Sequence, residues 1–306
     1  MDVAFTSLDQ PLFDDAGATK GDLVTYLDAV ADQLIAQLRD RPLSVMRARP
    51  GQRPFMQKNV PKNAPDWIKT VGIWAERSKR EVHYALCNDR PTLQWFANQR
   101  AVEYHPALWP QAHLVLDLDP PPGADFAVVA RTALLVREAL AAVGLEGAVK
   151  TSGAKGVHIF VPVDADGEQI AHATRALAAR AAALDPALAT TAYVVDKREG
   201  KVFVDSTRAG GATVVAAYSP RIRPGVPVSF PVGWDELERI APSDFTIFTV
   251  PERLAGRDLW AEAMPAPQPL PQELVEEGRA IPVARVVAMH EGKRRRSAAR
   301  NEQQGG

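Results

Sequence analysis

The feature that most constrains this chain is an apolar run that ends in two carboxylates. Residues 113–123 read His-Leu-Val-Leu-Asp-Leu-Asp-Pro-Pro-Pro-Gly. Such a run, followed by prolines and glycine, predicts a buried strand over residues 114–118 that leads into a turn. Because side chains alternate along a strand, Asp117 and Asp119 share one face. Two close carboxylates repel unless a cation lies between them. The pattern therefore indicates a site for a divalent metal ion. The alternative is that the two acids simply lie at a solvated strand end.

Strand and helix patterns are interleaved along the whole sequence. Strand patterns cover residues 43–47, 81–86, 157–163, 202–205 and 213–218. Helical spacing of apolar residues covers residues 126–143 and 168–184. This alternation predicts a mixed α/β, or α+β, fold. We expect a folded domain over residues 1–264 and then, over residues 265–306, a proline-rich linker and a basic, disordered tail.

Composition excludes several classes of protein. The 306 residues carry a formal net charge of −1, so a polyanion would have to bind at a local patch. Cys87 is the only cysteine, which excludes an intramolecular disulfide framework and a cysteine zinc cluster. Neither a signal sequence nor an apolar stretch long enough to span a membrane is present. We therefore expect a cytoplasmic protein without membrane contact.

A glycine-rich turn between two strand patterns forms the second motif. Residues 150–160 read Lys-Thr-Ser-Gly-Ala-Lys-Gly-Val-His-Ile-Phe. Glycines let backbone N–H groups approach an anion, while Ser152, Lys155 and His158 add donors, so the turn suits a triphosphate. Its spacing and the strand that follows do not match a Walker loop. The alternative is that Lys155 is a solvated lysine in a turn and that His158 is an ordinary histidine of a strand, with no ligand at either.

A third group of residues combines one more acid with arginines. Residues 201–208 read Lys-Val-Phe-Val-Asp-Ser-Thr-Arg, so Asp205 also ends an apolar strand. It could supply a third carboxylate to a two-metal site for phosphoryl transfer. Arg208 follows it, and Arg221 and Arg223 lie on one side of an extended segment where they could bind phosphate. Surface solubility is the alternative role for these arginines.

The order of these motifs resembles the polymerase domain of bacterial ligase D, in the archaeo-eukaryotic primase superfamily. The resemblance rests on Asp-Leu-Asp-Pro, Thr-Ser-Gly-x-Lys-Gly-x-His-Ile, Val-Phe-Val-Asp and Ala-x-Tyr-Ser-x-Arg-x-Arg, and covers residues 5 to 260. It implies a primase-like catalytic core of residues 101–264 with an antiparallel sheet like that of RNA-recognition motifs. A smaller N-terminal α/β part of about residues 1–100 would precede this core.

The resemblance also implies functional roles. Asp117, Asp119 and Asp205 would be catalytic and would hold two divalent ions, Mn²⁺ or Mg²⁺. The implied nucleotide-binding residues are Lys58, His105, Ser152, Lys155, Gly156, His158, Arg208, Ser219, Arg221 and Arg223. The implied DNA-binding residues are Lys20, Phe55 and Met56. The implied reaction is template-directed extension of a primer with NTPs or dNTPs, ribonucleotides being preferred, during gap filling and end repair by non-homologous end joining.

The same resemblance sets expectations for partners and location. Primer-template or gapped duplex DNA would be the substrate. A separate DNA ligase and a Ku-type end-binding protein would be partners of a stand-alone, monomeric, nucleoid-associated enzyme.

The sequence departs from the family pattern where the family contacts a 5′-phosphate across a gap. Ser7 and Gln10 stand where the family has Asn and Lys, and Lys20 keeps the third position. Uncharged side chains bind anions more weakly. Met56 replaces the second of two aromatic residues and stacks less well on a base than Phe55. These changes raise the question of how this chain recognises DNA.

Two other functions remain open from the sequence. A haloacid-dehalogenase phosphatase also carries Asp-x-Asp after an apolar strand, but near the start of its domain, whereas here 116 residues precede Asp117. A non-catalytic module that holds DNA ends for a ligase would keep the fold without needing all three acids. Activity with manganese distinguishes that module from a polymerase.

Overall fold

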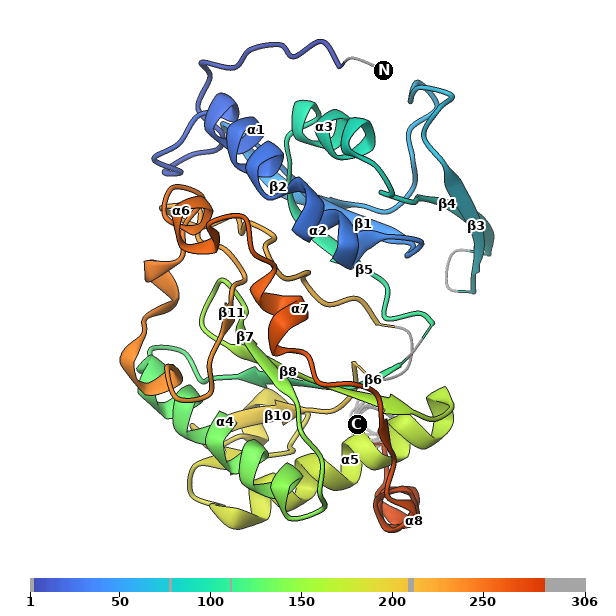
Figure 1. Ribbon diagram of the computed structural model, residues 1–306, viewed down its shortest axis with the longest axis vertical. Coiled ribbons are helices and arrows are strands. Elements are labelled where there is room, and N and C mark those ends of the chain that lie inside the picture. The colour runs from blue at the N-terminus through green and yellow to red at the C-terminus, as the bar shows by residue number, and fades with distance from the viewer. Residues whose placement is uncertain (1–2, 77–78, 111, 209–211, 284–306) are drawn as a thin grey trace, which may run out of the picture. The chain divides into compact units, whose positions relative to one another are not determined.

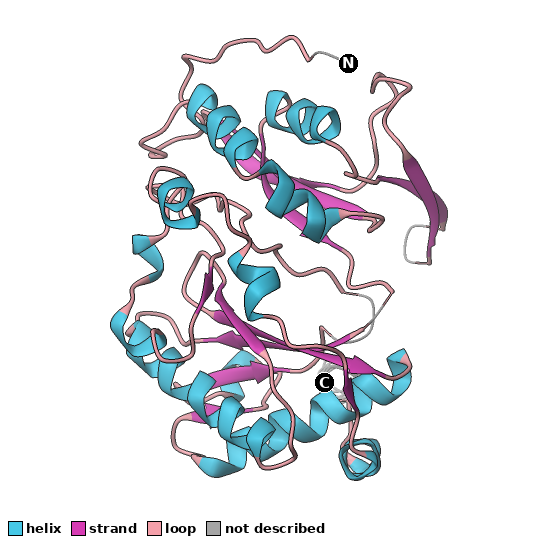
Figure 2. Ribbon diagram, in the orientation of Figure 1, coloured by secondary structure: helices cyan, strands magenta, loops and turns pink. Residues whose placement is uncertain are grey.

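The computed structural model describes residues 3–76, 79–110, 112–208 and 212–283, and the chain divides into two compact units. Unit one contains residues 1–111, 148–158 and 211–265. Unit two contains residues 112–147, 159–210 and 266–306. Helices and mostly antiparallel strands occur in both (Figure 1, Figure 2). The α+β class predicted from the sequence is confirmed, and each unit is assembled from segments that lie far apart in the chain.

Unit one contains a five-stranded antiparallel sheet with a group of helices beside it. Its strands are β1 (Leu43–Arg49), β2 (Gln52–Gln57), β3 (Thr70–Ala75), β4 (Arg80–Ala85) and β5 (Ala101–Pro106). They are ordered β2-β1-β4-β3, and β5 also pairs with β1. Three helices lie together next to this sheet: α1 (Lys20–Ala29), α2 (Ala31–Leu38) and α3 (Arg90–Asn98) (Figure 1). A capping box between Thr19 and Asp22 starts α1, and an Asp89 cap starts α3.

The remaining elements of unit one come from the second half of the chain. They are β7 (Ala148–Thr151), β11 (Pro231–Val232), α6 (Val250–Leu254), α7 (Leu259–Ala263) and two single 3₁₀ turns at Leu237–Arg239 and Pro242–Asp244. β11 pairs antiparallel with β7. Tyr218 joins these parts, because its hydroxyl donates to Asp258 and accepts from the Trp260 amide. The buried Tyr26 hydroxyl donates to the Tyr218 carbonyl.

Unit two is a sheet covered by long helices. In it β6 (His113–Asp119) lies between β8 (Val157–Asp164) and β10 (Val202–Asp205), and β9 (Ala189–Thr190) pairs with β10. The first two residues of β8 belong to unit one. Helices α4 (Phe126–Ala141) and α5 (Gly167–Leu184) pack on β6 and β10 (Figure 1). A 3₁₀ turn at Val195–Lys197 lies between β9 and β10 in the chain. Among the described residues, no helix is both long and apolar enough to cross a membrane.

The segment that was expected to be a linker is structured in its first part. β12 (Gln268–Pro269) pairs with β8, and α8 (Gln272–Ala280) packs on α5. Arg180 of α5 pairs with Glu277 at 2.7 Å and with Glu273 at 3.5 Å. Here the structure differs from the sequence-based expectation, because buried Leu274 and Val275 give a short helix an apolar face. The rest of the expected tail, residues 284–306, lies outside the described residues.

We predict that Gly278→Ala releases α8. A Cβ at this position would lie 1.8 Å from the His172 carbonyl oxygen, which belongs to the α5 backbone and cannot rotate away. The helices must separate, and we expect a loss of about 1–3 kcal/mol in the free energy of unfolding. Urea denaturation and limited proteolysis between residues 264 and 271 measure this. Arg279→Ala, at the exposed neighbouring position, is the control, and equal behaviour of the two variants would contradict the prediction.

Candidate active site

Strand pairing in unit two brings three carboxylates together. β10 runs antiparallel to β6 with Asp205 opposite Asp117 and Phe203 opposite Asp119. Directly opposed residues point to the same face of a sheet, and Asp119 lies two residues beyond Asp117 on that face. One carboxylate oxygen from each acid lies within 4.8 Å of the others. We call Asp117, Asp119 and Asp205 the acid cluster.

The environment of the acid cluster suits a cation. Asp117 and Asp205 are buried, and Asp119 is half-buried. Burial and the charges of Asp117 and Asp205 raise the pKa of Asp119 to about 6, against the opposing charges of two arginines. A donor set made only of carboxylates fits a hard divalent ion such as Mg²⁺ or Mn²⁺. The acid cluster can therefore hold the metal that the sequence indicated.

Arg208 contributes positive charge to the acid cluster. Its Nε and Nη2 atoms each lie 3.1 Å from Asp117 Oδ2, and its Nε lies 3.5 Å from Asp205 Oδ2. Burial alone would lower the pKa of this guanidinium, but the neighbouring carboxylates outweigh burial and raise it. The family resemblance implies that Arg208 binds nucleotide. In the structure it directly contacts two of the acids.

In unit one, the glycine-rich turn predicted from the sequence is a closed loop of residues 152–156. The Ser152 hydroxyl accepts from the amides of Ala154 and Gly156, and the Ser152 amide donates to the Gly156 carbonyl. Gly153 has a φ of +67°, which glycine adopts without strain. Lys155, at the outside of the turn, is exposed. The loop thus has a fixed backbone and presents one accessible cation.

A buried lysine lies beneath this loop. Lys150 of β7 is 1% exposed, and its Nζ lies 2.6 Å from Ser229 Oγ, 2.7 Å from His158 Nδ1 and 3.0 Å from the Val215 carbonyl oxygen. Ser229 in turn donates to the Thr151 carbonyl. His158 is therefore held by a side chain of the neighbouring strand, a contact that no local sequence pattern indicates.

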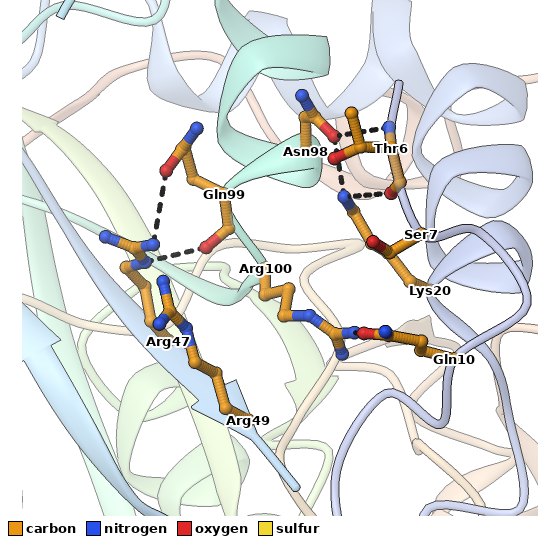
Figure 3. A pocket seen from close by; sticks show the side chains of 9 residues that line it. All are labelled: Thr6, Ser7, Gln10, Lys20, Arg47, Arg49, Asn98, Gln99 and Arg100. Carbon is orange, nitrogen blue, oxygen red and sulfur yellow. Dashed lines mark hydrogen bonds between the residues drawn. The ribbon is translucent and has the colours of Figure 1, made fainter.

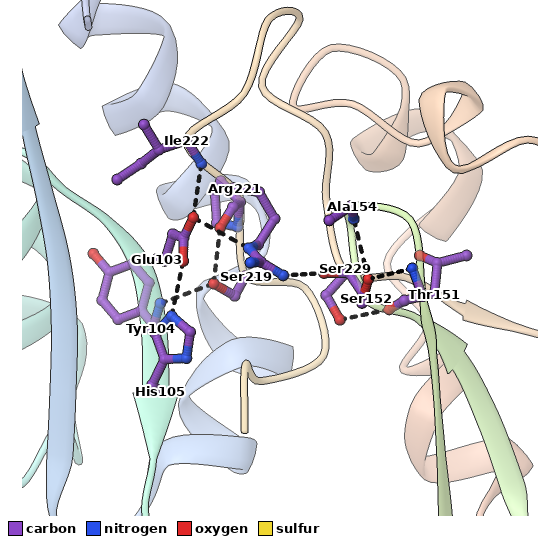
Figure 4. Close-up of polar contacts among 12 residues, drawn as sticks. Glu103, Tyr104, His105, Thr151, Ser152, Ala154, Ser219, Arg221, Ile222 and Ser229 are labelled. Carbon is purple, nitrogen blue, oxygen red and sulfur yellow. Dashed lines mark hydrogen bonds and ion pairs between the residues drawn. The ribbon is translucent and has the colours of Figure 1, made fainter. Parts of the chain in front are cut away.

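A third polar group of unit one surrounds Glu103 of β5 (Figure 4). Its Oε2 lies 2.9 Å from His105 Nε2, and its Oε1 lies 3.1 Å from Arg221 Nε. The Ile222 amide also donates to Oε1. Ser219 lies beside this group, where its hydroxyl accepts from the Tyr104 amide. Three residues of the predicted nucleotide-binding set, His105, Ser219 and Arg221, thus meet around an acid that was not predicted.

The other predicted residues of unit one lie at its surface. Lys58 and Arg223 are exposed, as are Phe55 and Met56, which retain 46% and 43% of their accessible surface. Phe55 and Met56 are consecutive residues of β2, so their side chains point to opposite faces. The Arg47 guanidinium lies 5.5 Å from the centre of the Phe55 ring.

Lys20 lies in a cationic cavity of unit one of about 240 Å³ (Figure 3). Its described lining residues include four cations and no acid: Thr6, Ser7, Gln10, Lys20, Arg47, Arg49, Asn98, Gln99 and Arg100. Lys20 Nζ donates to the Thr6 carbonyl and to Asn98 Oδ1. Burial and the charge of Arg100 lower the pKa of Lys20. We call this cavity the arginine pocket.

Comparison with known proteins decides which family this chain belongs to. Residues 19–260 match the family described as the LigD primase-polymerase domain. The chain belongs to the LigD primase-polymerase family. LigD primase-polymerase domains are DNA-directed nucleotidyltransferases. The resemblance stated from the sequence is thereby confirmed, and the dehalogenase alternative is set aside.

Individual relatives support the same assignment. The chain is 32% identical over 262 residues to the bifunctional non-homologous end joining protein LigD of Bacillus subtilis, covering 82% of this chain and 42% of that protein. The multifunctional LigD of Mycobacterium bovis is 31% identical over 296 residues, covering 90% and 39%. The chain thus spans about two fifths of the length of these curated relatives.

A solved structure extends the likeness to the fold. The polymerase domain of Mycobacterium tuberculosis ligase D, in complex with DNA, is 32% identical to this chain, with a TM-score of 0.75. The match covers 86% of this chain and 99% of that domain. This likeness confirms the primase-like fold expected from the sequence.

The structure identifies functional candidates that the sequence reading missed. Four charged residues each contact or electrostatically influence a predicted site residue: Glu103, Lys150, Arg100 and Arg198. Each is a single charged residue without a distinctive local pattern. The sequence offered one usable signal, because Glu103 lies two residues before His105 in a strand and must share its face.

We predict that the acid cluster destabilises the metal-free protein above pH 6. An unfolded aspartate loses its proton near a pKa of about 3.9, whereas folded Asp119 keeps it until about pH 6. The folded state therefore loses stability as the pH rises from 4 to 6 and stays at the lower level above that range. Asp119→Asn should remove this slope and raise the free energy of unfolding at pH 7.5 by about 1–2 kcal/mol, after allowance for partial exposure.

Urea denaturation in EDTA at several pH values measures this effect. Asp235→Asn, at an exposed acid of unit one, should keep the wild-type slope. Identical slopes for wild type and Asp119→Asn would contradict the prediction.

Proposed function

We propose that this protein extends the 3′-hydroxyl of a DNA primer with nucleoside triphosphates under the direction of a template, with a preference for ribonucleotides. The observation that carries the proposal is the acid cluster, complete in a chain of the LigD primase-polymerase family. All three acids are held by two paired strands, so the cluster is part of the folded framework. The physiological setting that we propose is gap filling during end joining, at the nucleoid.

The acid cluster would hold Mn²⁺ or Mg²⁺, and we propose two ions. A bound divalent ion would lower the pKa of an attacking hydroxyl and neutralise phosphate charge. The chain's own cations would bind and orient the nucleotide. Lys155 and Arg223 are exposed cations of unit one that are available to phosphate, and Lys155 lies on the closed 152–156 loop. Arg208 keeps its charge and limits repulsion among the acids.

Primer extension tests this proposal. Wild-type protein with Mn²⁺ should extend a primer across a short gap, faster with ribonucleotides than with deoxyribonucleotides. Asp117→Ala should lower the rate by about 100-fold or more, because it removes a metal ligand. Asp235→Ala, at an exposed acid outside the acid cluster, should leave the rate unchanged.

The same assay decides between polymerase and binding module. Absence of extension by the wild-type protein on every substrate, together with retained binding to DNA ends, would overturn the proposal. It would favour the non-catalytic module that assists a separate ligase.

We further propose that the arginine pocket binds the 5′-phosphate on the far side of a gap, although Ser7 and Gln10 are uncharged. A cation still lies beside Gln10, because Gln10 Oε1 accepts a hydrogen bond from Arg100 Nη2 at 2.8 Å. Arg100 Nη1 also donates to the carbonyls of Pro11 and Leu12, which holds the guanidinium in place. Arg49 is exposed at the pocket and lowers the pKa of Arg100 and of Arg47, after the larger effect of burial.

Such mutual repulsion among cations is relieved when an anion binds. The arginine pocket therefore suits a phosphate even though two family positions have changed. Phe55, beside Arg47, would offer a ring for the base next to that phosphate. A ligase and a Ku-type protein are the partners that we propose for sealing and holding such ends.

Arg49→Ala should weaken the preference for a 5′-phosphorylated gap by about three- to tenfold, because one charge-assisted phosphate contact is lost. The measurement is the ratio of extension rates on gapped duplexes that carry a 5′-phosphate or a 5′-hydroxyl. Arg131→Ala, on helix α4 of unit two, is the matched control. A wild-type enzyme indifferent to the 5′-phosphate would show that the arginine pocket has another role.

A further inference from the structure

Glu103 is the only acid among the described partners in the polar network of Figure 4. It is 7% exposed, and both of its oxygens are used. Oε2 accepts from His105, while Oε1 accepts from the Ile222 amide and faces Arg221 Nε. A buried carboxylate with this many donors is held rigidly, and its donors are held in return.

Arg221 carries the contact onward to the 152–156 loop. Its Nε faces Glu103, and its Nη1 donates to the Ser152 carbonyl oxygen at 2.5 Å. The arginine also packs tightly on the loop, because a Cβ added to Gly153 would lie only 2.7 Å from Arg221 Cγ. One guanidinium therefore joins the strand that carries Glu103 to the loop that carries Lys155.

The Glu103 carboxylate has a lowered pKa and keeps its negative charge at neutral pH. Burial alone would raise its pKa, but the hydrogen bond from His105, the charge of Arg221 and the Ile222 amide outweigh burial and lower the pKa to about 2. The carboxylate therefore remains ionised at neutral pH. Arg221 has this buried counter-ion on one side and a backbone carbonyl on the other.

We propose that Glu103 is a positioning residue that acts through Arg221 to fix the 152–156 loop for the incoming nucleoside triphosphate. The inference rests on the proposed function, which makes this loop part of the nucleotide site. Glu103 itself does not need to touch the nucleotide. Its effect is to keep Arg221 aimed at Ser152, and thereby to keep the loop closed before the nucleotide arrives.

This role predicts a change in nucleotide binding rather than in the chemical step. In Glu103→Gln the side chain keeps its shape but loses the charge that holds Arg221. We expect KM for the nucleotide to rise about tenfold, because the buried ion pair that orients Arg221 is lost, with kcat at saturating nucleotide within about twofold of wild type. In the nucleotide-free protein, hydrogen exchange at the Ala154 and Gly156 amides should become faster, while exchange elsewhere stays unchanged.

The experiment compares wild type, Glu103→Gln, Arg221→Lys and the double variant in primer extension with Mn²⁺. A lysine has one ammonium group and cannot span from Glu103 to Ser152, so Arg221→Lys should also raise KM. Because both changes break the same connection, the double variant should be no worse than the poorer single variant. Glu81→Gln, at an exposed acid of β4, is the control that should keep the wild-type KM.

Each outcome bears on a distinct claim. A normal KM and normal loop exchange in folded Glu103→Gln would overturn the positioning role, as would fully additive effects in the double variant. If Glu103→Gln does not fold, the loop exchange of Arg221→Lys decides, and an unchanged loop would overturn the inference. An inactive wild-type protein would instead refute the proposed function, so the two failures are distinguishable.

Discussion

The structure depends on the antiparallel pairing of β10 with β6, which forces three like charges into one place. The register sets Asp205 directly opposite Asp117, and strand alternation adds Asp119 on the same face. We expect this arrangement to cost stability in the metal-free protein, because burial and the neighbouring carboxylates raise the pKa of Asp119. Arg208 offsets part of the repulsion. Proteins keep such electrostatic strain where a bound ion relieves it, which is why the acid cluster indicates function rather than fold stability.

Some cations of unit one are paired inside the protein, and others are exposed. Lys150 is satisfied by Ser229, His158 and a carbonyl, and Arg221 is paired with Glu103, so these charges are fixed inside the framework. Lys155 and Arg223 remain exposed. The arginine pocket differs, because its described lining residues include four cations and no acid. Fixed, paired charges shape the backbone, whereas exposed or unbalanced charges are available to phosphate.

The sequence predicted those parts of the site that follow from local pattern. Alternation placed Asp117 and Asp119 on one face, and the helices expected over residues 126–143 and 168–184 are α4 and α5. The strand expected over residues 213–218 did not form. That segment has one isolated bridge, at Thr213, and ends in a turn at Tyr218, whose φ of +68° is not that of a strand. Within residues 265–306, expected to be a linker and tail, residues 272–280 form α8, which docks on α5 through contacts distant in sequence. Arg100 was missed because its contacts with Gln10, Pro11 and Leu12 are also distant in sequence.

Direct titration of Mn²⁺ tests the central claim, that the acid cluster is a metal site for nucleotide chemistry. Electron paramagnetic resonance of free Mn²⁺ would count the ions bound to wild type and to Asp205→Asn, with and without a non-hydrolysable nucleoside triphosphate. The account predicts that wild type binds Mn²⁺ and that the number of bound ions rises to two when the nucleotide is present. Asp205→Asn should lose this binding. Equal Mn²⁺ binding by wild type and Asp205→Asn, with or without nucleotide, would contradict it.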